Sequence, residues 1–223
     1  MTPLDKQEPA CVVAVDRREP AISRGDRAES CFAPCVRGTY PKGTPYDARP
    51  VIVLPTVEAT LSVGDYACAG IETLAAIERK SGPDLLSTLF GSPSQLSALG
   101  EQKRNIDRFR AELERARAAG TWLRIVVEAG PGWLYAEAER RAGTYGKSFD
   151  PERVQAMLES FDVDLGIATV WPGSKRAAEL YVGRVLSRVW SQACGGDGAK
   201  KMRARGYQVP WLGTLDAKAK GVM

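Results

Sequence analysis

Short apolar runs rich in Val, Ile and Ala recur along the chain and predict its β-strands. Runs of this kind, when charge, proline or glycine bounds them, are typical of strands buried in a sheet. The predicted strands are Cys11–Val15, Val51–Leu54, Val57–Tyr66, Ala75–Lys80, Trp122–Glu128 and Leu165–Trp171.

Apolar residues at steps of three and four predict helices between these strands. The clearest apolar face combines Ile106, Phe109, Leu113 and Ala116. Elsewhere the signals are capping residues and first-turn prolines, as in Ser81-Gly82-Pro83 and Asp150-Pro151. Helices are therefore predicted from Ser81, around residues 106–116 up to Gly120, from Asp150 to about Ser160, and across Ser174–Trp190.

The order of these elements predicts an α/β fold in which helices flank a mixed sheet. With 223 residues, the chain is long enough for one such domain with a real core. Residues 20–50 interrupt the pattern with a stretch rich in Gly, Pro, Ser and Arg. This loop is longer than a compact domain usually holds without a functional use. We expect a domain over residues 1–194 and a flexible tail over residues 195–223.

The net charge is concentrated in that tail. The chain carries +4 in total, and the excess of bases over acids in residues 195–223 is also four. Such a basic tail indicates either a nucleic-acid-binding arm or a solvated, partly disordered terminus. The candidate DNA-binding residues in it are Lys200, Lys201, Arg203 and Arg205.

The chain contains no histidine. This excludes Ser-His-Asp and Cys-His triads and histidine-bound zinc, so carboxylates, lysine, tyrosine or metal-bound water must carry any acid–base chemistry. The five cysteines are unevenly spaced, which favours reduced thiols and a cytoplasmic setting. Cys31 and Cys35 alone are a weak indication of zinc. No apolar run approaches 18 residues, so no membrane span is expected.

The stretch Val63–Asp84 carries the candidate chemistry. In a strand, Glu78 and Lys80 point to one face and Arg79 to the other. If the strand that holds Asp65 pairs antiparallel with this one, two carboxylates and an ammonium meet at one sheet edge. Carboxylates without imidazole suit Mg²⁺, which prefers oxygen ligands. The sequence therefore predicts a site that cleaves phosphodiesters with a divalent metal.

Five blocks carry a family resemblance: VDRRE (15–19), VGDY (63–66), IERKSGPDLLSTL (77–89), RFRAEL (108–113) and IVVEA (125–129). Together they resemble the nuclease domain of the xeroderma pigmentosum group F family, in the PD-(D/E)XK, restriction-endonuclease-like superfamily. The resemblance covers roughly residues 11–190. No tandem helix-hairpin-helix module is recognisable after it, which leaves junction specificity open.

The resemblance assigns roles residue by residue. It implies that Asp65 and Glu78 bind the metal and that Lys80 positions or polarises the attacking water. The remaining residues that match the family's catalytic positions are Asp16, Arg18, Glu19, Arg79 and Asp84. Each also has a structural interpretation. Asp84 can simply cap its helix, whereas the charged residues after the first strand can simply end it.

Two functions follow as expectations. The first is a Mg²⁺- or Mn²⁺-dependent endonuclease that cuts branched, flapped or single-strand-containing DNA in repair or recombination. The second is a non-catalytic module that keeps the fold for DNA binding or dimerisation. The resemblance also implies a homodimer or heterodimer. Arg104 and Arg108 are interpreted as the solvated face of their helix, and Glu128 as structural or as a support to the site.

Overall fold

The structure, a computed structural model, describes residues 11–18, 32–37, 45, 49, 51–90, 99–145 and 149–193. It divides into two compact units. The first unit contains the chain up to Ala76 and again from Glu179, and the second contains Ile77–Ala178. Glu19 and residues 194–223, with the four predicted DNA-binding residues of the tail, lie outside the described part. The predicted domain limits therefore stay predictions.

A mixed sheet forms the centre of the first unit. Strand β1 (Val13–Asp16) pairs parallel with β4 (Thr56–Ala59) and antiparallel with β5 (Tyr66–Cys68). All four residues of β1 are buried, as its apolar sequence predicts. The predicted strand 57–66 is wrong in its middle: β4 ends at Ala59, and Gly64 adopts a φ of 70° before β5 begins.

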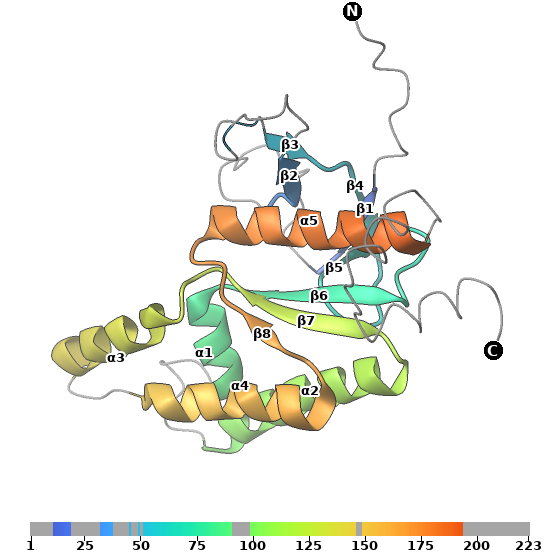
Figure 1. Cartoon of the computed structure of the whole chain (residues 1–223). Helices are drawn as coiled ribbons and strands as arrows, with labels where there is room; N and C mark the ends of the chain where they lie inside the picture. The colour runs from blue at the N-terminus through green and yellow to red at the C-terminus, as the bar shows by residue number, and fades with distance from the viewer. Residues whose placement is uncertain are drawn as a thin grey trace, which may run out of the picture. The chain divides into compact units, whose positions relative to one another are not determined.

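The predicted 20–50 loop contains a strand that the sequence analysis missed. Strand β2 (Cys35–Arg37) pairs antiparallel with β3 (Val51–Val53). Helix α5 (Lys175–Ala193), whose part from Glu179 belongs to this unit, runs beside this pair (Figure 1). A Cβ added to Gly183 would lie 2.6 Å from the backbone nitrogen of Cys35. The helix therefore approaches β2 at a distance that admits no side chain.

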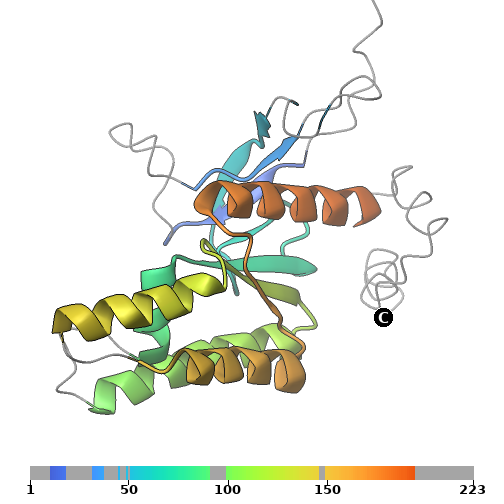
Figure 2. The same ribbon diagram turned by 60° about the vertical axis from the view of Figure 1, so that its left-hand side comes forward.

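In the second unit, helices cover one side of the strands (Figures 1 and 2). Strand β7 (Trp122–Val127) pairs parallel with β8 (Thr169–Val170), and residues 77–80 of β6 (Ala75–Lys80) also belong to this unit. The helices on that side are α1 (Gly82–Phe90), α2 (Leu99–Ala118) and α4 (Pro151–Leu165). Strands and helices thus alternate as the predicted α/β class requires.

Apolar faces and caps explain why these helices form where they do. Phe109 of α2 contacts Phe161 of α4 edge to face, with ring centroids 5.9 Å apart. The side chain of Asp150 accepts a hydrogen bond from the Glu152 amide, which confirms the predicted start of α4. The helix ends at Leu165, five residues beyond the predicted end, and Gly166 follows it in the left-handed conformation. Consequently β8 is much shorter than the predicted strand 165–171.

Helix α3 (Gly132–Tyr145) is the second element that the sequence analysis missed. Its Trp133 lies against the start of α1, where a Cβ added to Gly82 would be 2.7 Å from the indole ring. The glycine therefore lets the indole close the junction between β6 and α1. No helix in the described part of the chain is both long and apolar enough to span a membrane.

Candidate nuclease site

The first unit brings Asp16, Arg18 and Asp65 together at the end of β1. The backbone N–H of Asp16 donates to the carbonyl of Asp65 at 2.9 Å. The Asp16 carboxylate is buried and accepts hydrogen bonds from the backbone and side chain of Arg18 and from the Leu61 amide. Both carboxylate oxygens are thus engaged, and they hold the segment after β4 against the end of β1.

These bonds also set the protonation of Asp16. Burial alone would raise its pKa, but the hydrogen bonds from Arg18 and Leu61 and the charge of Arg18 outweigh burial, so the pKa is lowered. Asp16 therefore remains an anion at neutral pH. The geometry gives it a structural role in addition to the catalytic role that the resemblance implies.

In the second unit, β6 separates its charged side chains onto two faces as the alternation predicts. The Lys80 ammonium contacts the Glu78 carboxylate at 2.6 Å, and the side chains are only 19% and 5% exposed. On the other face, Arg79 Nε lies 2.9 Å from Glu128 Oε1. The backbone N–H of Glu128 also donates to the carbonyl of Lys80. Glu128 thus supports β6 through both its side chain and its backbone.

Asp84 lies in the first turn of α1, where it takes part in a cap. The Ser81 hydroxyl donates to its carboxylate at 2.6 Å, and its own N–H donates to Ser81 Oγ at 3.2 Å. This reciprocal pair is sufficient to explain an aspartate at this position. The structure therefore favours the capping interpretation that the sequence left open.

A polar cavity of about 300 Å³ opens beside Lys80; we call it the Lys80 cavity. The Lys80 ammonium also lies 5.3 Å from the centroid of the Phe109 ring, which forms part of the wall. Apart from Lys80, the described residues of the lining all come from helices α1 and α2. The residues that line it are Lys80, Ser87, Thr88, Asn105, Arg108, Phe109 and Glu112.

The sequence analysis assigned none of the cavity residues on α1 and α2 to the site. Asn105, Arg108 and Glu112 follow one another at i, i+3 and i+7, which places them on one face of α2. Because this spacing is also that of an ordinary solvated face, the sequence alone could not distinguish the two. The deciding information is the packing of α1 against α2.

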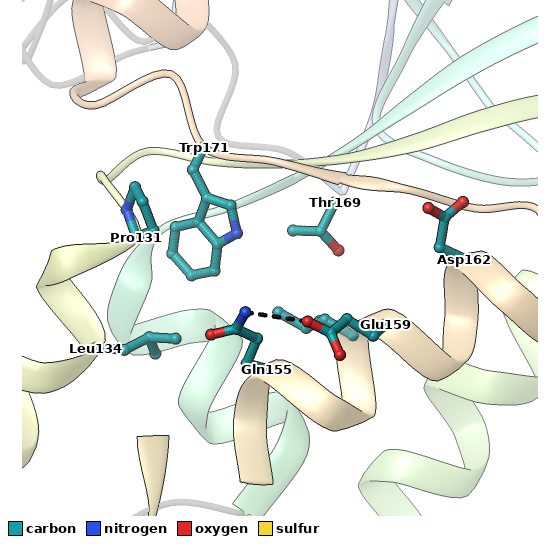
Figure 3. Close-up of a pocket in the computed structure, with 8 residues that line it drawn as sticks. Pro131, Leu134, Gln155, Glu159, Asp162, Thr169 and Trp171 are labelled. Carbon is teal, nitrogen blue, oxygen red and sulfur yellow. Dashed lines mark hydrogen bonds between the residues drawn. The ribbon is translucent and has the colours of Figure 1, made fainter. Parts of the chain in front are cut away.

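A second cavity, of about 250 Å³, lies between α4, β8 and the start of α3; we call it the Trp171 cavity (Figure 3). The Gln155 amide donates to Glu159 at 3.0 Å across its floor, and Trp171 lies opposite. The buried Thr169 hydroxyl has no hydrogen-bond partner in the described structure. The lining comprises Pro131, Leu134, Gln155, Leu158, Glu159, Asp162, Thr169 and Trp171, none of which the sequence analysis assigned.

No protein-family model matches the chain, and no curated protein matches it. Two solved structures of XPF from Aeropyrum pernix are similar to it, each with a TM-score of 0.47. The first is 16% identical and covers 81% of this chain. The second, a complex with DNA, is 18% identical and covers 82%. The chain spans 65% and 66% of those two proteins, slightly less than two thirds of their length.

Both structures come from the family that the sequence motifs resemble. The function proposed below nevertheless rests on the residues of this chain. Within the described ranges, no group of three or more His, Cys, Asp and Glu side chains gathers closely enough to hold a metal ion. Asp65 lies in the first unit and Glu78 in the second, so their joint role as metal ligands stays a prediction.

Proposed function

We propose that the chain is a divalent-metal-dependent endodeoxyribonuclease that cuts branched, flapped or single-strand-containing DNA in repair or recombination. The observation that carries the proposal is the nearly buried Glu78–Lys80 pair at 2.6 Å, whose lysine opens onto a polar cavity. Burying a charge is costly unless it is paired, so a carboxylate and an ammonium enclosed together beside a cavity are typical of a functional site.

The donor atoms fit Mg²⁺ or Mn²⁺. The proposed ligands, Asp65 and Glu78, offer only carboxylate oxygens, and the chain has no histidine. Among the described cysteines, Cys11 and Cys68 face each other in the first unit with their sulfurs 3.7 Å apart. Because Mg²⁺ keeps several waters, two carboxylates are sufficient to hold it. The bound ion would lower the pKa of a water and polarise the phosphate.

The protein residues supply the remaining chemistry. The Lys80 ammonium, oriented by Glu78, can donate a hydrogen bond to the attacking water or to a phosphate oxygen on which charge develops. Glu128 holds Arg79 on the opposite face and fixes the end of β6 through its bond to the Lys80 carbonyl. Lys80 is thereby held in one orientation, which reduces the reorganisation that the reaction requires.

The test is a cleavage panel of flap, splayed-arm, junction, single-stranded and duplex DNA with Mg²⁺, Mn²⁺ or EDTA. We expect cleavage of the branched substrates only when metal is present, and its loss in Glu78→Gln. This substitution keeps a carbonyl oxygen to accept from Lys80. The Asp150→Asn variant is the control, because it alters the cap of α4 rather than the β6 pair.

Two outcomes would reject the enzyme. If the protein binds the panel but cuts nothing in either metal, it is the non-catalytic DNA-binding or dimerisation module. If Glu78→Gln cuts as fast as the parent, cleavage arises elsewhere in the chain or from a contaminant. Sedimentation of the same preparations would test the proposed homodimer.

A further inference from the structure

Several side chains that line the Lys80 cavity carry hydrogen-bond donors without a partner among the described residues. In the described part of the chain, Arg108, Asn105 and Thr88 have no hydrogen-bond or ion-pair partner. Ser87 differs, because its hydroxyl already donates to the Asp84 carbonyl at 2.9 Å. Guanidinium, amide and hydroxyl donors from two helices therefore line one cavity without an acceptor among the described residues.

Arg110, two residues after Arg108 on α2, provides a comparison, because it forms ion pairs within the protein. Its guanidinium lies 3.2 Å from Glu114 and 3.6 Å from Asp164. Arg108 makes no such ion pair with any described carboxylate. The lysine that shares its cavity is itself matched by Glu78, so that Arg108 repeats the sign of Lys80 without a counter-charge of its own.

Because Glu78 already pairs with Lys80, Arg108 is the cation of this cavity that no described ion pair balances, and a bound anion would supply its counter-charge. The donors suit phosphate: arginine presents a planar fork that matches phosphate oxygens, and asparagine and threonine side chains commonly donate to DNA phosphates. Glu112 contributes a single negative charge to the lining, which disfavours a dianion such as free inorganic phosphate more than a singly charged phosphodiester.

We propose that the Lys80 cavity is a phosphate subsite that holds a backbone phosphodiester of the DNA strand to be cut. Arg108, Asn105 and Thr88 bind this phosphate, and Lys80 at the inner wall acts on the neighbouring one. The inference rests on the proposed nuclease function and adds to it the residues that bind the DNA backbone. Arg108 is then a DNA-binding residue, and its contribution precedes the chemical step.

The experiment measures DNA binding without cleavage. Fluorescence anisotropy of a labelled flap DNA in EDTA, across a salt titration, compares the parent with Arg108→Ala and Arg110→Ala. Both variants lose one positive charge from α2, but only the first alters the cavity. We expect Arg108→Ala to weaken binding about tenfold. The slope of log K against log salt concentration should become shallower by about 0.7–0.9, the value of one phosphate contact. Arg110→Ala should change neither quantity measurably.

Because Arg108 is exposed and has no partner within the described structure, its replacement should leave the thermal midpoint unchanged, and this is checked first. Arg108→Lys should recover part of the affinity, because it keeps the charge and loses the fork. If Arg108→Ala and Arg110→Ala weaken binding equally, the subsite is rejected while the nuclease proposal stands. If the parent neither binds nor cuts DNA, both proposals fail together.

Discussion

The Lys80 cavity and the Trp171 cavity are similar in size, about 300 and 250 Å³, but their linings differ in charge and in satisfied bonds. The Lys80 cavity carries two cationic side chains and one carboxylate. The Trp171 cavity carries the carboxylates of Glu159 and Asp162 beside an indole, and none of the described residues that line it is cationic. A phosphate is therefore attracted to the first and repelled by the second.

Cavity volume therefore does not identify the site in this protein; the charge and the unpaired donors do. Both cavities lie in the second unit, but different helices line them: α1 and α2 line the Lys80 cavity, and α3 and α4 line the Trp171 cavity. The two cavities are similar in size, and we propose that the sign of a few side chains decides which of them receives nucleic acid. Variants of either cavity can test this contrast.

The largest expected effect comes from Lys80→Gln set against Trp171→Ala. The glutamine amide still donates to Glu78, so the fold is kept while the ammonium is lost. We expect single-turnover DNA cleavage in Mg²⁺ to slow by at least about 10²-fold in Lys80→Gln, and Trp171→Ala to cut at the parent rate. Equal slowing in the two variants would remove the functional distinction between the cavities.

A second test disturbs the packing at the start of α1, the helix that carries Thr88. In Gly82→Ala the new methyl would meet the Trp133 ring, because a Cβ at this position lies only 2.7 Å from it. Overpacking of this kind costs about 1–3 kcal/mol, measured as a lower urea midpoint. The double variant Gly82→Ala/Trp133→Leu should lose less stability than the sum of the single changes. Strict additivity would show that the indole does not hold the start of α1.

A third test uses Asp16, which lies in the first unit and outside both cavities. Its pKa is lower in the folded protein than in the unfolded chain, where an aspartate titrates near about 3.9. The carboxylate therefore stabilises the fold fully above that value, and the stabilisation is lost as pH falls through the lower, folded-state pKa. Asp16→Asn should cost about 1–3 kcal/mol at pH 7 and lose less on acidification than the parent.

Urea unfolding of both proteins at pH 7 and pH 3 measures this difference. Parallel loss of stability in the parent and Asp16→Asn would mean that the hydrogen bonds from Arg18 and Leu61 do not set the protonation of Asp16.

The smallest expected effect comes from neutralising the Trp171 cavity. Glu159→Gln with Asp162→Asn removes two negative charges and keeps the acceptor for Gln155. The removal of exposed charges is worth about 0–1 kcal/mol, so DNA affinity should rise by a few-fold at most in low salt. A marked fall in affinity would show that DNA uses this cavity, which would overturn the comparison.

The sequence predicted the elements with strong local signals. The apolar strand β1, the β6 alternation and the Asp150 cap depend on residues close in the chain, and the structure confirms them. The sequence analysis missed two elements because their formation depends on partners far away in the chain. Strand β2 is defined by its pairing with β3, and α3 begins in a Gly-Pro-Gly segment whose signals favour a turn.

The candidate site shows the same division. The pairing of Glu78 with Lys80 follows from alternation along one strand, so the sequence could predict it. The role of Arg108 depends on how α2 packs against α1, and no spacing within α2 reveals which of its charged residues faces a cavity. Arg79 lies between these cases: alternation predicts its face, but its partner Glu128 follows the end of another strand, β7.

The close approach of α5 to β2 also bears on how this chain could have diverged. A substitution at Gly183 would place its Cβ against the Cys35 backbone, which no rotamer change can relieve because the obstacle is main chain. A chain that keeps this helix–strand contact is therefore confined to glycine at position 183. Any larger residue there would require the segment around residues 32–37 to move, so we expect position 183 to vary only together with this strand pair.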